Sequence, residues 1–386
     1  MDKSATAETA GWAVPLSDVR VDDELRAAVA ETLDSGWWSM GPRVGRFEEE
    51  FAAFIGTRYA LAVSNGTAAL HLALLAVGCG SGDEVVVPSL NFVAAANAIA
   101  HTGAAPVFCD VSGEDDLNLD PTDLEAALTE RTKAVVVLHY GGFACDMDAV
   151  RELAGTRGLE IVEDAAHAPG ATWRGEPCGT LGRISCFSFF ANKNLPLGEG
   201  GMIATDDEEL AERVRLLRSH GMTTLTWDRH RGHAGGYDVL AQGFNYRLDE
   251  IRAAMGLVQL ARLRDENAAR GRLAARYRAA LDGQKGITMP FGSQESGTES
   301  SHHLAVVLLP GGTDRDQLRA ALGERRIQTS VHYPPIHLFT QYREAGARRP
   351  LPRTEKIASR LLTLPLYAHM EDAKADLVAE SLLEAV

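Results

Sequence analysis

The sequence predicts an α/β fold with a large three-layer α/β/α domain, built on a mostly parallel sheet, and a smaller C-terminal α/β domain. Three observations support this prediction. Apolar runs of strand length alternate with stretches of helical period, the strand candidates are apolar on both faces, and the pattern changes after about residue 247. Because parallel strands need crossover connections, the alternation favours helices on both sides of one sheet.

The elements of the large domain follow in a regular order. Strands are expected at 84–88, 105–109, 132–139, 159–163, 186–190 and 202–205, and helices at 66–77, 92–101, 120–128 and 146–157. Ligands of such sheets bind at the carboxyl ends of the strands. We therefore expect the functional residues in the segments that follow each strand.

The C-terminal part has a different pattern. A long helix is expected at 249–281, and the polar stretch 291–301 follows it. Strands at 303–309 and 327–333, a helix at 314–325 and a terminal helix after Glu371 complete the smaller domain. The expected domain limits are a flexible tail at 1–14, a large cofactor-binding domain at 15–248 and a small domain at 249–386.

Composition limits the classes of function. The 386 residues include 38 Lys and Arg against 53 Asp and Glu, a formal charge of -15, which disfavours nucleic acid or an anionic membrane as the main partner. The five cysteines are scattered singly without zinc-ligand spacing, which suits a reducing cytoplasm. No segment resembles a signal peptide or a membrane span, so a cytoplasmic location is expected. The scattered cysteines likewise predict no metal site.

Lys193 marks the expected site of chemistry. It lies between the apolar run Cys186-Phe-Ser-Phe-Phe190 and the turn Gly198-Glu-Gly-Gly201, while Asp164 ends an upstream apolar strand. A lysine in this setting can form an imine with a carbonyl compound, and a buried carboxylate can keep a ring nitrogen of that compound protonated. Pyridoxal phosphate needs both groups, so we predict a site for this cofactor. A surface lysine and a helix-capping aspartate are the plain alternatives, and His167 either touches the ring or is structural.

A phosphate site is predicted where the stretch 61–74 changes from a short strand to a strong helix. Free N–H groups at the start of that helix, with the Thr67 hydroxyl beside them, suit a phosphate. Simple helix capping by Asn65 or Thr67 is the alternative. Ser188, ahead of the lysine, is a further phosphate donor.

Four motifs together carry a resemblance to a known family. They are Asn65-Gly-Thr-Ala, Glu163-Asp-Ala-Ala-His, Ser188-x4-Lys193-Asn-Leu and Gly198-Glu-Gly-Gly, with further matches at Gly41-Pro-x3-Arg46-Phe-Glu, Gly142-x3-Asp146-Met, Gly243-Phe-Asn245-Tyr-Arg-Leu-Asp249-Glu and His332-Tyr-Pro-x2-His337. In this order they resemble the DegT/DnrJ/EryC1/StrS aminotransferases, which are fold-type I pyridoxal-phosphate enzymes. The resemblance covers nearly the whole chain.

The resemblance implies a role for individual residues. Lys193 is implied to form the imine with the cofactor and to move the proton between substrate carbon and cofactor, and Asp164 to bind the pyridine nitrogen. Phe92 corresponds to the aromatic residue that stacks on the ring. The implied phosphate ligands are Gly66, Thr67 and Ser188, joined by Asn245 from a second subunit. A homodimer with shared active sites follows from this resemblance.

The resemblance also implies the reaction. L-glutamate is the implied amino donor, and a keto sugar nucleotide is the implied acceptor. We favour C4 amination of a dTDP-4-keto-6-deoxyhexose, with C3 amination of a dTDP-3-keto sugar or amination of a keto-cyclitol as alternatives.

The substrate residues have weaker signals. The stretch 222–237 contains Arg229 among other basic residues, and it either lies over a diphosphate or is a solvated loop. His332, Tyr333 and His337 either border the sugar pocket or belong to a structural Tyr-Pro-Pro turn.

Two other classes of function are alternatives to an aminotransferase. A cofactor-binding regulator without turnover fits the same lysine site, but no basic helix-turn-helix segment is evident. A nicotinamide-dependent oxidoreductase is disfavoured because the glycines at 78–82 lack the GxGxxG spacing.

Overall fold

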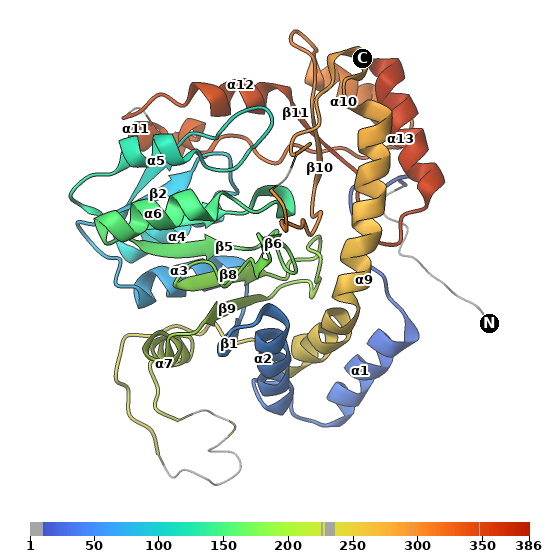
Figure 1. Ribbon diagram of the computed structural model, residues 1–386. Coiled ribbons are helices and arrows are strands. Elements are labelled where there is room, and N and C mark those ends of the chain that lie inside the picture. Colours follow the sequence, from blue (N-terminus) through green and yellow to red (C-terminus); the bar gives the residue numbers. More distant parts are fainter. Residues whose placement is uncertain (1–10, 225–226, 228–235, 294, 347) are drawn as a thin grey trace.

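A computed structural model describes residues 11–224, 227, 236–293, 295–346 and 348–386 (Figure 1). Within these residues, seven strands form the main sheet in the order β1-β9-β8-β5-β4-β2-β3. The strands are β1 (Tyr59–Val63), β2 (Glu84–Pro88), β3 (Ala105–Cys109), β4 (Thr132–Leu138), β5 (Glu160–Asp164), β8 (Ile184–Ser188) and β9 (Gly201–Thr205). β9 is antiparallel to its two neighbours, and the remaining pairs are parallel, which confirms the mostly parallel sheet.

Helices cover both faces of this sheet. The helices of this part are α1 (Asp23–Asp34), α2 (Pro42–Ile55), α3 (Gly66–Ala76), α4 (Ala94–Thr102), α5 (Pro121–Ala127), α6 (Met147–Arg157) and α7 (Glu208–Leu217). Along β4, Val135 and Val137 face the core shared with α2, α5 and α6, whereas Ala134 and Val136 face the core shared with α3, α4 and α7. Alternation along a strand thus explains why its whole sequence is apolar.

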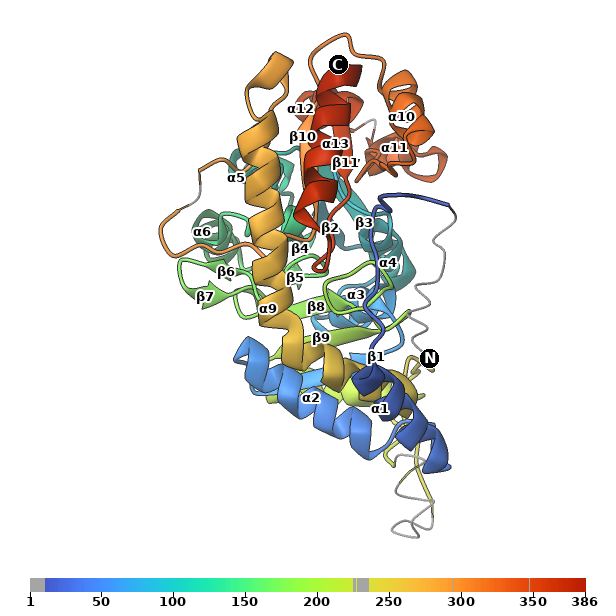
Figure 2. The same ribbon diagram turned by 90° about the vertical axis from the view of Figure 1, so that its right-hand side faces the viewer.

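The long helix α9 (Glu250–Leu281) connects the main sheet with the C-terminal part (Figures 1 and 2). It packs against α1 and α2 at one end and against α13 (Asp372–Ala385) at the other. There β10 (Ala305–Leu308) pairs antiparallel with β11 (Leu361–Leu364), and α10 (Arg315–Glu324) completes the core. The remaining α-helices and strands that the structure describes are the hairpin β6 (Thr172–Trp173) and β7 (Glu176–Pro177), the short α11 (Arg343–Gly346) and α12 (Pro352–Arg360). None of the helices that the structure describes is both long enough and apolar enough to cross a membrane.

One expectation for the C-terminal part is wrong. The strand predicted at 327–333 is reduced to single bridges, Ile327 with Val14 and Ser330 with Thr363. The backbone at the start of this segment forms hydrogen bonds with an N-terminal segment: Gln328 donates its N–H to the Val14 carbonyl at 3.0 Å. Val14 is only 1% exposed, whereas Gly11 and Ala13 are exposed. The flexible tail expected at 1–14 therefore stays a prediction.

The predicted domain boundary at 248/249 stays a prediction. It coincides with the start of α9, where the Asp249 side chain accepts from the Arg252 N–H as the helix cap. Beyond it, however, Ile336, Tyr342 and Leu351 pack in the core of the main sheet. The chain after residue 249 therefore does not lie wholly in the smaller core.

Glu163, at the carboxyl end of β5, connects the sheet to the loop before β8. Its Oε1 accepts from the N–H groups of Leu181 and Gly182 at 2.7 and 2.6 Å, and its Oε2 accepts from Gly179 at 2.7 Å. His139 Nδ1 accepts the Cys145 N–H, so its Nε2 carries a proton and donates to Glu163 at 2.9 Å. This fully buried carboxylate positions the strand that ends in Asp164.

We expect Glu163→Gln to destabilise the fold. The amide presents N–H donors to a site that supplies only donors, which leaves buried groups unpaired and costs about 3 kcal/mol of the free energy of unfolding. The matched control is Glu160→Gln on the same strand, whose partner Arg183 is 45% exposed, with an expected loss below about 1 kcal/mol. Thermal unfolding of the two variants checks this. Equal melting temperatures would contradict the role given to Glu163.

Candidate active site

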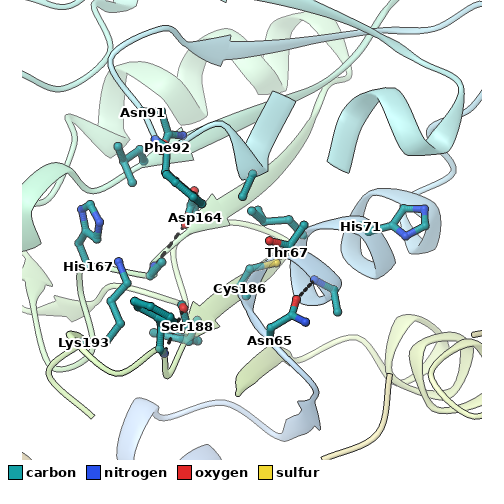
Figure 3. A pocket seen from close by; sticks show the side chains of 18 of the residues that line it. Asn65, Thr67, His71, Asn91, Phe92, Asp164, His167, Cys186, Ser188 and Lys193 are labelled. Atoms are coloured by element: carbon teal, nitrogen blue, oxygen red, sulfur yellow. Dashed lines mark hydrogen bonds between the residues drawn. The ribbon is translucent and has the colours of Figure 1, made fainter. Parts of the chain in front are cut away.

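A cavity of about 600 Å³ lies at the carboxyl ends of β5 and β8, next to the start of α3. Figure 3 shows its lining: Lys193, His167 and Asp164 approach from one side, and Asn65 and Thr67 from the other. The residues come from distant parts of the chain. The parallel sheet places the ends of these strands together, as expected for this architecture.

The start of α3 is shaped to receive an anion. The Asn65 side chain accepts the Ala68 N–H at 2.8 Å, and helix geometry leaves the N–H groups of Gly66 and Thr67 without intrahelical partners. A Cβ on Gly66 would lie 2.8 Å from Ser188 Cβ, so only glycine allows β8 to approach this closely. The three predicted phosphate residues of this chain, Gly66, Thr67 and Ser188, therefore line one wall of the cavity.

Lys193 is held in surroundings that disfavour its charge. Burial lowers the pKa of its amine to about 8, although the carboxylate of Asp164 acts in the opposite direction. Its Nζ lies 3.5 Å from Nε2 of His303. A lysine with such a pKa supplies a neutral, nucleophilic amine near physiological pH.

Asp164 is the acid that faces this lysine. Burial raises its pKa, while Lys193, the Ala166 N–H and the Asn91 amide oppose the shift. Its side chain is almost inaccessible, with 5% of the residue exposed. A carboxylate so placed is suited to bind a protonated ring nitrogen, because it has one opposite charge and little water around it.

His167 and Tyr333 form a neutral pair beside the lysine. His167 Nδ1 accepts the Gly141 N–H at 3.2 Å, so its Nε2 carries the proton and donates to the Tyr333 hydroxyl at 2.9 Å. Burial, with help from Lys193 and His332, holds the pKa of His167 well below its usual range. Burial also raises the pKa of Tyr333. Both groups therefore act as uncharged hydrogen-bonding partners.

The other predicted residues have different positions. Phe92 lines the cavity with 56% of its surface exposed, 5.9 Å from the Tyr333 ring, and His332 lines the cavity as well. Asn245 is not among the residues that line the cavity in the described part of the chain. Arg229 falls outside the described residues.

The placement of His337 at the sugar pocket needs correction. Its Nδ1 lies 2.6 Å from the Ser89 hydroxyl and its Nε2 3.3 Å from Glu355, and only 5% of the residue is exposed. Its N–H also donates to Ser89 at 3.2 Å. His337 therefore joins the segment after β2 to the C-terminal part and does not border the cavity, because the 3-10 turn at 336–338 faces the core of the main sheet.

Several cavity residues were missed from the sequence. Asn91 precedes Phe92 and opposes the rise in the pKa of Asp164, and Tyr246 follows Asn245. Both are therefore sequence neighbours of predicted site residues. His303, which contacts Lys193 but is not among the residues that line the cavity, had no such neighbour. It begins the approach to β10, and only the tertiary fold brings it to Lys193.

These groups together fit pyridoxal phosphate. The amine, the buried carboxylate and the helix start line one cavity, and the close approach of Gly66 to Ser188 leaves the backbone N–H groups open to a phosphate. Asp164 would meet the ring nitrogen, Lys193 the aldehyde and Gly66, Thr67 and Ser188 the phosphate.

Comparisons with known proteins agree with this chemistry. The model of the DegT/DnrJ/EryC1/StrS aminotransferase family matches residues 19–383. The spore coat polysaccharide biosynthesis protein SpsC of Bacillus subtilis is 43% identical over 380 residues, 97% of each chain. Among solved structures, DesV from S. venezuelae, in complex with a ketimine intermediate, is 42% identical with a TM-score of 0.84, covering 94% of each chain. DesI, in the presence of its TDP-sugar product, is 34% identical with a TM-score of 0.85, covering 97% of this chain and 92% of its own. The chain therefore belongs to the DegT/DnrJ/EryC1/StrS aminotransferase family, the pyridoxal-phosphate-dependent sugar aminotransferases.

Proposed function

We propose that this enzyme moves an amino group from L-glutamate to a dTDP-4-keto-6-deoxyhexose, with amination at C4. One observation supports the transaminase reaction: the Lys193 amine, with a pKa of about 8, shares a cavity with the buried Asp164 carboxylate and the start of α3. The nucleotide part rests on likeness to DesI, which is described with a TDP-sugar product. SpsC, in turn, is named for polysaccharide biosynthesis.

In the proposed mechanism the cofactor, when bound, stores the amino group between the two half-reactions and withdraws electrons from the reacting carbon. The residues of the chain position the cofactor and the substrate and move protons. Asp164 holds a proton at the ring nitrogen, and its burial strengthens that ion pair. Phe92, which lines the cavity and is 56% exposed, would cover one face of the ring.

Lys193 is the proposed proton carrier of the reaction. Its Nζ would carry the proton between the substrate carbon and the cofactor, and a pKa of about 8 makes both uptake and release of the proton feasible near neutral pH. His167 stays neutral and donates to Tyr333, so it adds no charge that would repel a protonated lysine. His332 and Tyr333 border the space for the sugar.

A nucleotide sugar also needs positive charge for its diphosphate. No arginine lines the cavity within the part of the chain that the structure describes. We therefore retain Arg229 as the proposed diphosphate contact, because guanidinium groups bind phosphate oxygens in pairs.

We further propose a homodimer in which Asn245 of each subunit completes the site of its partner. In its own chain, Asn245 bridges to Ser219, while the adjacent Tyr246 reaches the cavity. Exposed apolar side chains at Tyr237, Val239 and Leu240 precede it and suit burial against a second copy. The five cysteines are buried and unpaired, which suits the reducing cytoplasm that we propose as its location.

The variant Lys193→Arg tests the transaminase mechanism. Arginine keeps a positive charge but stays protonated, so it cannot condense with an aldehyde. Transamination and the visible absorbance of lysine-bound cofactor should both disappear. Lys356→Ala, at a lysine whose side chain is 68% exposed, should leave both unchanged. Turnover in the Lys193 variant, measured as release of 2-oxoglutarate from glutamate, would refute the transaminase mechanism.

A further prediction concerns the acceptor. A panel of dTDP-3-keto and dTDP-4-keto sugars and keto-cyclitols is incubated with the enzyme and glutamate. The 4-keto sugar should give the highest kcat/KM, and NMR should place the new amine on C4. An amine at C3, or turnover of cyclitols alone, would overturn the proposed acceptor and leave the aminotransferase assignment intact.

Shared active sites can be tested by complementation. Lys193→Ala and Asn245→Asp each disable a different component of the proposed composite site, the second because a carboxylate repels phosphate. If the sites are shared, a mixed dimer contains one site with both defects and one site with neither. Refolding the two inactive variants together should therefore restore about a quarter of wild-type activity, since half of the dimers formed are mixed. Absence of recovery, with dimers present by light scattering, would show that each site is built from one subunit.

A further inference from the structure

His303 makes a contact with Lys193 that the reaction outlined above does not use. Its Nε2 lies 3.5 Å from Nζ of Lys193, and the residue is 5% exposed. It comes from the segment before β10, far along the chain from the lysine, and lies behind Lys193 without being among the described residues that line the cavity. Contacts between catalytic groups are often long without ligands and shorten in the working complex.

The other ring nitrogen of His303 belongs to a chain of hydrogen bonds with a defined direction. Asn194 Nδ2 donates to the Ser301 carbonyl at 2.8 Å, and a carbonyl can only accept, so the amide orientation is set. The Asn194 oxygen therefore faces His303 Nδ1 at 2.9 Å.

The chain continues to a second backbone carbonyl. Asn267 Nδ2 donates to the Pro169 carbonyl at 2.8 Å, which turns its oxygen toward Asn194 Nδ2 at 2.7 Å. Two carbonyls thus fix both amides in the same sense. Since the Asn194 oxygen only accepts, His303 Nδ1 carries the proton and Nε2 of the neutral ring has a free lone pair.

We propose that His303 is a positioning residue that accepts a hydrogen bond from the free amine of Lys193. This bond fixes rotation about the terminal bond of the lysine and turns the lone pair of the amine toward the cavity. The role matters whenever the amine is released and has to attack a carbonyl again. It rests on the proposed function only through the bond between Lys193 and the cofactor, and it does not depend on the sugar.

The charges around the pair favour this arrangement. Burial, with Lys193, His167, Arg270 and His332 as nearby positive or titratable groups, holds the pKa of His303 well below its usual range. Burial likewise lowers the pKa of His332 to about 4. Asp164 is the acid that acts on the lysine from β5. His303 therefore remains a neutral acceptor in the pH range where Lys193 loses its proton.

Two variants test the contacts of the two ring nitrogens of His303 separately. In His303→Asn, the side-chain amide can still donate to Asn194 but cannot reach the lysine. In His303→Gln, the longer amide places an oxygen near the position of Nε2. His302→Asn, at the neighbouring ring that packs 5.6 Å from Phe143, is the matched control.

The experiment measures cofactor capture by the full-length protein. Cofactor-free enzyme is mixed with pyridoxal phosphate, and the visible absorbance gives the rate of bond formation with Lys193 from about pH 6 to about pH 10. Affinity for pyridoxamine phosphate is measured in parallel, because that compound has no aldehyde and cannot condense with the lysine. Circular dichroism confirms that each variant is folded.

We expect His303→Asn to capture pyridoxal phosphate about three- to tenfold more slowly at high pH, the effect of one lost neutral hydrogen bond. Its affinity for pyridoxamine phosphate should be unchanged. His303→Gln should recover part of the rate, and His302→Asn should match the wild type.

The pH dependence has a defined sign. A neutral acceptor stabilises the charged lysine more than the neutral one, so its loss should move the inflection of the rate below the wild-type pKa of about 8. A merely space-filling histidine would admit water when shortened, which would raise the inflection toward the ordinary lysine value and weaken pyridoxamine phosphate binding as well. Either that pattern or an unchanged capture rate would overturn the proposal. Failure of the wild-type protein to capture pyridoxal phosphate at all would instead contradict the proposed function.

Discussion

Removal of one amine and one carboxylate from water imposes the main constraint on this structure. Burial disfavours the charged form of both Lys193 and Asp164, and each offsets part of the cost of the other. The balance leaves a lysine that can lose its proton near neutral pH and an acid that can keep a ring nitrogen protonated. Both properties would be lost in a water-filled groove, so the surrounding protein has to exclude solvent without adding charge.

The neighbouring side chains meet this condition by remaining neutral. His167, His303 and His332 all lie near the lysine, and burial lowers the pKa of each. Backbone groups set the proton positions on two of these rings, through the Gly141 N–H for His167 and, by way of Asn194, the Ser301 carbonyl for His303. Donor and acceptor directions at the site are thus determined by the main chain, which does not change its protonation with pH.

Much of the fold was predictable because it depends on local pattern. The strands β2 to β5 and their helices follow from apolar runs that serve two cores at once, as in β4. Family membership likewise confirms the predicted aminotransferase function and argues against the two alternatives, a regulator and a nicotinamide-dependent enzyme. The predicted strand at 327–333 was wrong because its backbone bonds to residues near Val14, a partner more than 300 residues away that no local pattern announces.

The sequence by itself determined the reactive groups: a lysine before a glycine-rich turn, an acid ending a strand, and a small-residue turn opening a helix. The order of the motifs along the sequence identifies these groups, because each group is positioned by the strand or helix next to it in the chain. The tertiary structure alone decided which distant side chains act on those groups. It directed His337 to Ser89 and not to the cavity, and it brought His303 to Lys193. The physical reason is that local hydrogen bonding and periodicity set secondary structure, whereas proximity across the chain arises only when whole faces pack and exclude water.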